Sequence, residues 1–112
     1  MKYELIYNMF PSFLSQMKKY NDRYRHIKEF KSCKLEVIKA LQTSPRYYLP
    51  LNAHPLKGNM QGLYSISTGL NSNRDRVVYM IDDENKCVYL KSIGDHSVYE
   101  SNLGYWIEHN LI

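Results

Sequence analysis

The chain has 112 residues, which is enough for one domain with a modest core and too short for two. Its net charge is +4, and no stretch is long and apolar enough to be a membrane span. Cys33 and Cys87 lack the spacing of a metal site, and polar residues interrupt Met1–Phe10, unlike the core of a signal peptide. We therefore expect one intracellular domain, residues 1–112, with reduced thiols and no metal site.

The first half predicts one strand followed by two helices. Lys2–Tyr7 is typical of a short strand, and Pro11 suits the first turn of a helix. The apolar stripe of that helix consists of Phe10, Phe13, Leu14, Met17 and Tyr20. Asn21 and Asp22 interrupt the stripe, so a second helix is expected from about Arg23 to Leu41. Because the break is short, the helices should form an antiparallel hairpin.

Basic residues are concentrated in this helical region. Between residues 18 and 39 they number eight against three acidic ones: Lys18, Lys19, Arg23, Arg25, Lys28, Lys31, Lys34 and Lys39. From Asp75 onward the balance reverses, with seven acidic residues against three basic ones. The basic region suits a polyanion or an acidic protein partner, and it equally suits an ordinary solvated helix face.

The second half predicts three strands. Gly62–Thr68 alternates as a strand does, after a loop at 46–59 whose apolar residues should pack along the domain. Arg76–Ile81 and Cys87–Ile93 flank the polar segment Asp82–Lys86, which is typical of an antiparallel hairpin. Residues 100–112 form a C-terminal extension. The order β-α-α-β-β-β predicts an α+β fold, with an antiparallel sheet and a helical hairpin on one face.

Four segments of the second half resemble a known superfamily in their order. They are His54-Pro55-Leu56-Lys57-Gly58-Asn59, Gly62-Leu63-Tyr64, Arg76-Val77-Val78-Tyr79 and Ile93-Gly94-Asp95-His96-Ser97-Val98-Tyr99. Together they resemble the RelE/ParE superfamily of bacterial toxins, most closely its YafQ- and RelE-like messenger-RNA interferases. The element order extends this resemblance over roughly Lys2–Tyr99. It implies a single cytoplasmic RelE-like toxin domain belonging to a type II toxin–antitoxin pair.

The resemblance also implies a reaction. Such toxins enter the ribosomal A site and cut the messenger by attack of a ribose 2′-hydroxyl on the adjacent phosphate, with no metal required. This chemistry needs a group that takes the 2′ proton, a group that stabilises the pentacoordinate phosphorus and a group that protonates the leaving 5′-oxygen. The implied partners are a cognate antitoxin, the ribosome and messenger RNA, with no membrane and no small-molecule cofactor.

The resemblance assigns six candidate site residues. His96 and His54 match two family histidines and would transfer protons, because imidazole titrates near neutral pH. Arg76 matches an arginine whose fork of donors suits a phosphate that gains charge. Tyr99 matches an aromatic residue that would stack on a base or hold the nucleotide. The expected contacts with the RNA are Lys57 and Arg74.

Some positions depart from the family pattern. Ser65 and Ser67 stand where many relatives place arginine or lysine, and His96 and Tyr99 are one residue closer than in part of the family. Arg76 could also pair with Asp95 or Asp75 across the sheet in place of a substrate. Three functions stay open: a ribosome-dependent endoribonuclease, favoured by the two histidines; a ParE-like toxin that poisons gyrase, favoured by the two serines; and a non-catalytic RNA- or protein-binding module that uses the basic helices.

Overall fold

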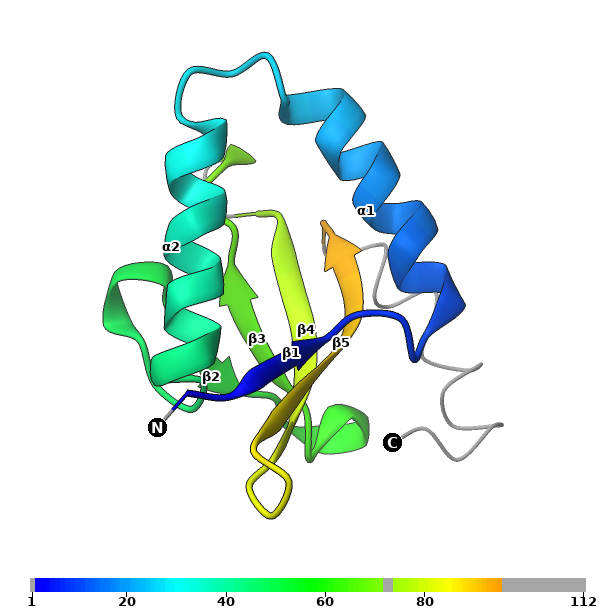
Figure 1. Ribbon diagram of the computed structural model, residues 1–112, viewed down its shortest axis with the longest axis vertical. Helices are drawn as coiled ribbons and strands as arrows, with labels where there is room; N and C mark the ends of the chain where they lie inside the picture. Colours follow the sequence, from blue (N-terminus) through cyan, green and yellow to red (C-terminus); the bar gives the residue numbers. More distant parts are fainter. Residues whose placement is uncertain (1, 72–73, 96–112) are drawn as a thin grey trace.

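A computed structural model of the protein describes residues 2–71 and 74–95, which form a five-stranded sheet with two helices on one face (Figure 1). The helices are α1 (Pro11–Tyr24) and α2 (Phe30–Thr43), and two short 3-10 turns follow, η1 (Leu49–Leu51) and η2 (Gly58–Met60). The strands are β1 (Glu4–Ile6), β2 (His54–Pro55), β3 (Tyr64–Ser67), β4 (Arg76–Asp82) and β5 (Cys87–Gly94). The predicted α+β fold class is confirmed.

The sheet is mixed, whereas a wholly antiparallel sheet was expected. Its strand order is β1-β5-β4-β3-β2, and β2, β3, β4 and β5 pair antiparallel with their neighbours. β1 runs parallel to β5, with Leu5 opposite Val88. Parallel neighbours cannot be joined by a tight turn, and here the chain between β1 and β5 contains both helices and the other three strands.

The boundary between the helices was predicted too early. α1 continues through Asn21 and Asp22 to Tyr24, and α2 begins at Phe30 and not near Arg23. Tyr24 is buried, with its ring 4.9 Å from that of Tyr20 between centroids. Burial of this aromatic side chain extends the apolar face of α1 by one turn, which outweighs the turn preference of the two polar residues.

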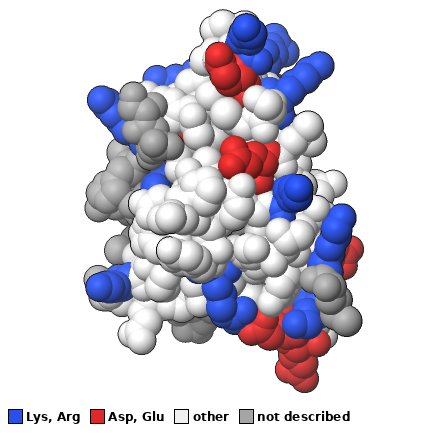
Figure 2. Space-filling view, turned by 90° about the vertical axis from the view of Figure 1, so that its left-hand side faces the viewer, with Lys and Arg blue, Asp and Glu red and all other residues white. Residues whose placement is uncertain are grey.

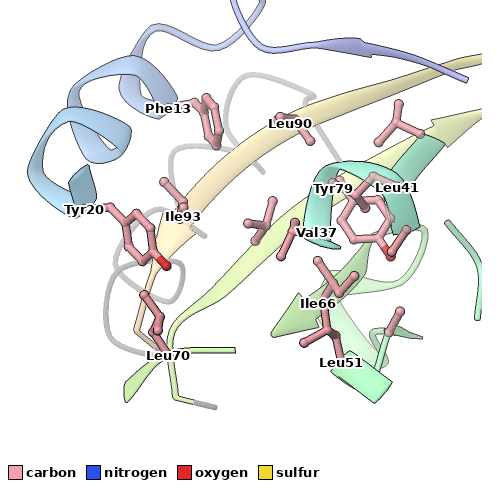
Figure 3. Close-up of a cluster of buried hydrophobic side chains, with 14 of the residues drawn as sticks. Phe13, Tyr20, Val37, Leu41, Leu51, Ile66, Leu70, Tyr79, Leu90 and Ile93 are labelled. Carbon is pink, nitrogen blue, oxygen red and sulfur yellow. The ribbon is translucent and has the colours of Figure 1, made fainter. Parts of the chain in front are cut away.

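The helix-facing side of the sheet carries the main core. Side chains from both helices, three sheet strands and two loops meet there (Figure 3): Phe13, Tyr20, Val37, Leu41, Leu51, Ile66, Leu70, Tyr79, Leu90 and Ile93. Tyr79 is fully buried, and its hydroxyl donates a hydrogen bond of 2.6 Å to the carbonyl of Pro45. The hydroxyl is thus satisfied inside the core, as a buried tyrosine requires.

Alternation along β4 decides which residues face away from the helices. Val77 and Tyr79 enter the main core, so Arg76 and Val78 point to the opposite face. A smaller apolar cluster forms on that face around Leu63 and Val78. Among the described helices, none is long and apolar enough to cross a membrane.

The loop predicted at 46–59 contains a strand that the sequence did not indicate. Leu51 is buried, as expected of a packed segment, but His54 and Pro55 then form β2 at the sheet edge. His54 pairs with Ser65 of β3. Proline is tolerated at a sheet edge because no neighbouring strand needs its missing N–H.

An ion pair ties the β4–β5 turn to the segment after α2. Arg46 donates through Nη1 to Asp83 Oδ1 at 2.9 Å and through Nη2 to Oδ2, and Tyr3 donates its hydroxyl to Oδ1 at 2.6 Å. The guanidinium of Arg46 lowers the pKa of Asp83 to about 2. The pair therefore connects three segments that are distant in sequence.

We expect Asp83→Asn to change the acid sensitivity of folding. The pKa of Asp83 in the folded state is depressed below the ordinary 3.8, so its contribution to the free energy of unfolding is complete above that pH and is lost as the pH falls toward 2. Urea-unfolding midpoints measured across this range should fall less steeply for the variant than for the wild type. Asp22→Asn removes an exposed pair with Arg25 at 3.7 Å and serves as the control. Equal profiles for wild type and Asp83→Asn would contradict this role.

Candidate functional site

Arg76 and His54 lie together on the sheet face opposite the helices. Arg76 opens β4 and pairs with Ser67, while His54 on β2 pairs with Ser65. The Nη2 atom of Arg76 is 3.5 Å from Nδ1 of His54. Two side chains 22 residues apart in sequence thus meet because β3 lies between their strands and sets both registers.

Hydrogen bonds hold the guanidinium of Arg76 in place. Its Nε donates to the hydroxyl of Ser65, and its Nη2 donates to the carbonyl of Asn52 at 2.8 Å and to the carbonyl of Ser65 at 3.3 Å. Ser65 is almost fully buried, so its hydroxyl is a fixed acceptor. A planar cation anchored in this way keeps one orientation before any ligand arrives.

The carboxylate of Asp75, one of the alternatives considered for Arg76, has other partners. It is buried on the helix side beside Tyr24 and accepts a hydrogen bond from Nδ2 of Asn71 at 3.2 Å. Burial and this neighbouring carboxylate raise the pKa of Tyr24 to about 12. The polar cluster around Asp75 is thus on the opposite side of the sheet from the guanidinium of Arg76.

Asn52 organises both side chains through its backbone. It has the left-handed conformation (φ 51, ψ 47), which asparagine tolerates better than most residues. Its carbonyl lies 2.8 Å from Nδ1 of His54 and accepts from Arg76 at the same distance. A carbonyl can only accept, so a hydrogen bond from the ring to this carbonyl requires a proton on Nδ1. This contact orients the imidazole ring of His54.

The two serines of β3 are buried, and Ser65 is a structural part of this site. The sequence presents Ser65 and Ser67 as positions that lack the cations of many relatives. In the structure both are buried: Ser65 accepts from Arg76, and Ser67 Oγ accepts from the backbone N–H of Gly69 at 2.9 Å. Sequence reasoning therefore missed Ser65 and Asn52 as supports of the site. An asparagine between two apolar residues was the one available signal for Asn52.

Lys57 and Arg74 are exposed and lie outside this network. Lys57 lines an open hollow of about 410 Å³ in the turn between β2 and β3, and Arg74 lies in the turn before β4. Within the described ranges, no hydrogen bond or ion pair joins either side chain to His54 or Arg76. Lys57 and Arg74 can therefore contact only a ligand that extends beyond His54 and Arg76.

His96 and Tyr99 lie outside the described residues. β5 ends at Gly94, which pairs with Arg76, so β5 ends beside the backbone of Arg76. In the part of the chain that the structure describes, no group of three or more His, Cys, Asp or Glu side chains could hold a metal ion.

We expect substitutions of Asn52 to separate backbone conformation from side-chain chemistry. Asn52→Gly should keep the fold and the His54 tautomer, because glycine adopts positive φ freely. Asn52→Val should lower the free energy of unfolding by about 1–3 kcal/mol and displace the shared carbonyl. Urea unfolding and the imidazole ¹⁵N shifts of His54 would measure the two effects.

Lys86→Val is the matched control for this pair. Lys86 also has positive φ, but it lies in the β4–β5 turn. The Lys86→Val variant should have a lower free energy of unfolding than the wild type, with no change in the imidazole ¹⁵N shifts of His54. An unchanged His54 spectrum in Asn52→Val would show that the carbonyl does not set the tautomer.

No protein-family model and no curated protein matches the sequence. Solved structures of bacterial toxins do match the described fold. A YoeB/ParE toxin from Agrobacterium tumefaciens superposes with a TM-score of 0.60 and 18% identity, over 83% of this chain and 98% of that chain. The toxin–antitoxin complex RelBE2 from Mycobacterium tuberculosis superposes with a TM-score of 0.59 and 20% sequence identity, over 86% of this chain and 100% of the matched chain.

YafQ from E. coli gives a TM-score of 0.60 with 14% identity, over 87% of this chain and 97% of that chain. These identities are low, but the similarity extends over nearly the whole length of each toxin. The resemblance seen in the sequence motifs is thus confirmed at the level of the fold. The chain has the fold shared by YoeB/ParE, RelE and YafQ toxins.

Proposed function

We propose that the protein is the toxin of a type II toxin–antitoxin system and cleaves messenger RNA in the ribosome. The observation that carries the proposal is the contact between Arg76 and His54 across the carbonyl of Asn52. It places an anchored cation beside an oriented imidazole. Cleavage of RNA by its own 2′-hydroxyl needs both groups at one phosphate.

In this reaction Nε2 of His54 takes the proton of the 2′-hydroxyl. The 2′-oxygen then forms a bond to phosphorus, and the bond from phosphorus to the 5′-oxygen breaks. His96 gives a proton to the leaving 5′-oxygen, and Tyr99 holds the adjacent nucleotide. Arg76 stabilises the charge that develops on the phosphoryl oxygens, and its anchored position means that little reorganisation accompanies the reaction.

The RNA outside the scissile phosphate would meet the exposed cations. Lys57 and Arg74 lie in turns at either end of β3 and would contact the RNA backbone. Ribosome-bound messenger in the cytoplasm is the proposed substrate, and residues 1–112 act as a single toxin domain. A cognate antitoxin is the proposed protein partner, in keeping with the toxin–antitoxin complex among the structural neighbours.

A gyrase-poisoning toxin is the second candidate. The observation that favours it is the burial of Ser65 and Ser67, which leaves β3 without a cation toward the substrate. The same fold occurs in a toxin described as YoeB/ParE. A binding module without catalysis would use the basic helices and would not require the contact between Arg76 and His54.

Induction of the wild-type protein in bacteria should arrest growth and cut messengers within translated codons. We expect His54→Ala to lower the cleavage rate on programmed ribosomes by about 10²–10⁴-fold, because it removes the base. Arg76→Lys should also impair cleavage, because lysine cannot reproduce the anchored fork. His26→Ala, at an exposed histidine in the turn between the helices, is the control. Growth arrest with intact messengers and DNA damage would instead establish the gyrase candidate.

His96→Ala should relieve the arrest as well. In single-turnover cleavage it should remove the limb of the pH–rate profile that reports the general acid, while His54→Ala should remove the limb of the base. Circular dichroism would establish that both variants fold. Wild-type rates and pH dependence in His96→Ala would exclude this residue as the acid.

A further inference from the structure

The turn that joins β2 to β3 contains an open hollow of about 410 Å³. Residues 55–58 and 61–64 line it, and of these only Lys57 has a part in the reaction proposed above. The backbone N–H of Leu56 donates a hydrogen bond of 2.8 Å to the carbonyl of Leu63, which ties the two sides of the turn together. The hollow is therefore formed by the fold of the turn before any ligand binds.

The hollow lies beside the candidate site. Leu56 and Leu63 line it, and both belong to the smaller apolar cluster on the face of the sheet that carries Arg76. The lining begins at Pro55, the residue directly after His54 on β2. Lys57 is three residues beyond His54, which is about 10 Å along an extended chain. A nucleotide held at His54 can thus place its base in the hollow.

The chemistry of His54 sets the direction of the RNA. In the proposed reaction this histidine takes the proton of the 2′-hydroxyl, so the ribose that carries the hydroxyl lies over β2. That ribose belongs to the nucleotide on the 5′ side of the cut. Arg76 lies on β4, on the other side of β3, so the scissile phosphate lies toward β4. The base of the 5′ nucleotide is therefore the one next to the hollow.

The walls of the hollow suit a flat ring with polar edges. Gly58 and Gly62 both have positive φ, 65° and 96°, and no atom of the described chain lies within 4 Å of the place that a Cβ would take at either residue. The walls are therefore open at these two residues. Gln61 is exposed and lines the hollow between them, so its carboxamide can both donate to and accept from a base.

Positive charge alone does not single out a path for the RNA. On the α2 side of the molecule, lysine and arginine side chains surround a broad uncharged area and do not form one patch (Figure 2). At the hollow, Lys57 is exposed, and none of the described residues that line it is an aspartate or glutamate. Apolar walls, one carboxamide and one cation can meet the face of a base, its edge and the adjacent phosphate.

We propose that this hollow binds the base on the 5′ side of the cut and that Gln61 selects adenine there. The inference rests on the proposed function, because that reaction sets the direction of the RNA. Adenine presents an acceptor at N7 beside a donor at N6, whereas guanine presents two acceptors at the same edge. The carboxamide of Gln61 matches adenine, since it donates to N7 and accepts from the N6 amino group.

Cleavage of ribosome-bound messengers that differ only in the base on the 5′ side of the mapped cut tests the selection. The full-length wild type should cut after adenine about tenfold faster than after the other bases. Gln61→Ala should bring the four rates within about twofold of one another. Gln61→Glu should favour cytosine, because a carboxylate accepts from the N4 amino group.

Gln42→Ala is the matched control, because Gln42 is a glutamine of α2, on the other side of the sheet. It should keep the wild-type preference for adenine. Equal wild-type rates for the four bases, or an unchanged preference in Gln61→Ala, would overturn the proposal and leave the nuclease function intact.

Binding of an RNA that cannot be cut separates the hollow from the reaction. The probe is the trinucleotide AAA with 2′-O-methyl riboses, and its twin is CCC. We expect AAA to shift the methyl NMR signals of Leu56 and Leu63, with an affinity about tenfold above that of CCC and about tenfold lower in Gln61→Ala. These shifts in a protein without nuclease activity would support the hollow and contradict the proposed function. Cleavage of messengers without any shift at the two leucines would overturn the hollow alone.

Discussion

The carbonyl of Asn52 is the acceptor on which the candidate site depends. It binds the imidazole of His54 and the guanidinium of Arg76 at the same distance, 2.8 Å. Without this carbonyl, the imidazole of His54 and the guanidinium of Arg76 would each lose one hydrogen bond. The shared acceptor fixes both orientations, and it can do so only because Asn52 has a left-handed conformation and β3 sets the registers of β2 and β4.

Much of this fold could be predicted from the sequence, and the failures have identifiable causes. The hairpin of β4 and β5 was predictable because two apolar runs flank a polar turn. The end of α1 was not, since burial of Tyr24 outweighs the turn preference of two polar residues. The pairing of β1 with β5 was not predictable either, because a strand of three residues can join either edge of a sheet. The path of the chain between the two strands decides which edge β1 joins.

The sequence predicted only those residues of the candidate site that belong to a recognisable sequence motif. His54 and Arg76 were identified from the resemblance, and the structure brings them into contact. Asn52 and Ser65 were missed because their contribution depends on a backbone conformation and on a strand register. Lys91 was also unexpected: it is fully buried, with Nζ 4.1 Å from the ring centroid of Phe10, and burial lowers its pKa to about 8.

β4 presents a different environment on each of its two faces. Consecutive residues lie on opposite sides of the sheet, with Arg76 in the candidate site and Val77 in the main core. A side-chain change at either residue can therefore alter one face and leave the other intact. A shift of β4 by one residue would exchange the faces and disrupt both, because side chains alternate along a strand. The register of β4 is thus the constraint that the core and the candidate site share.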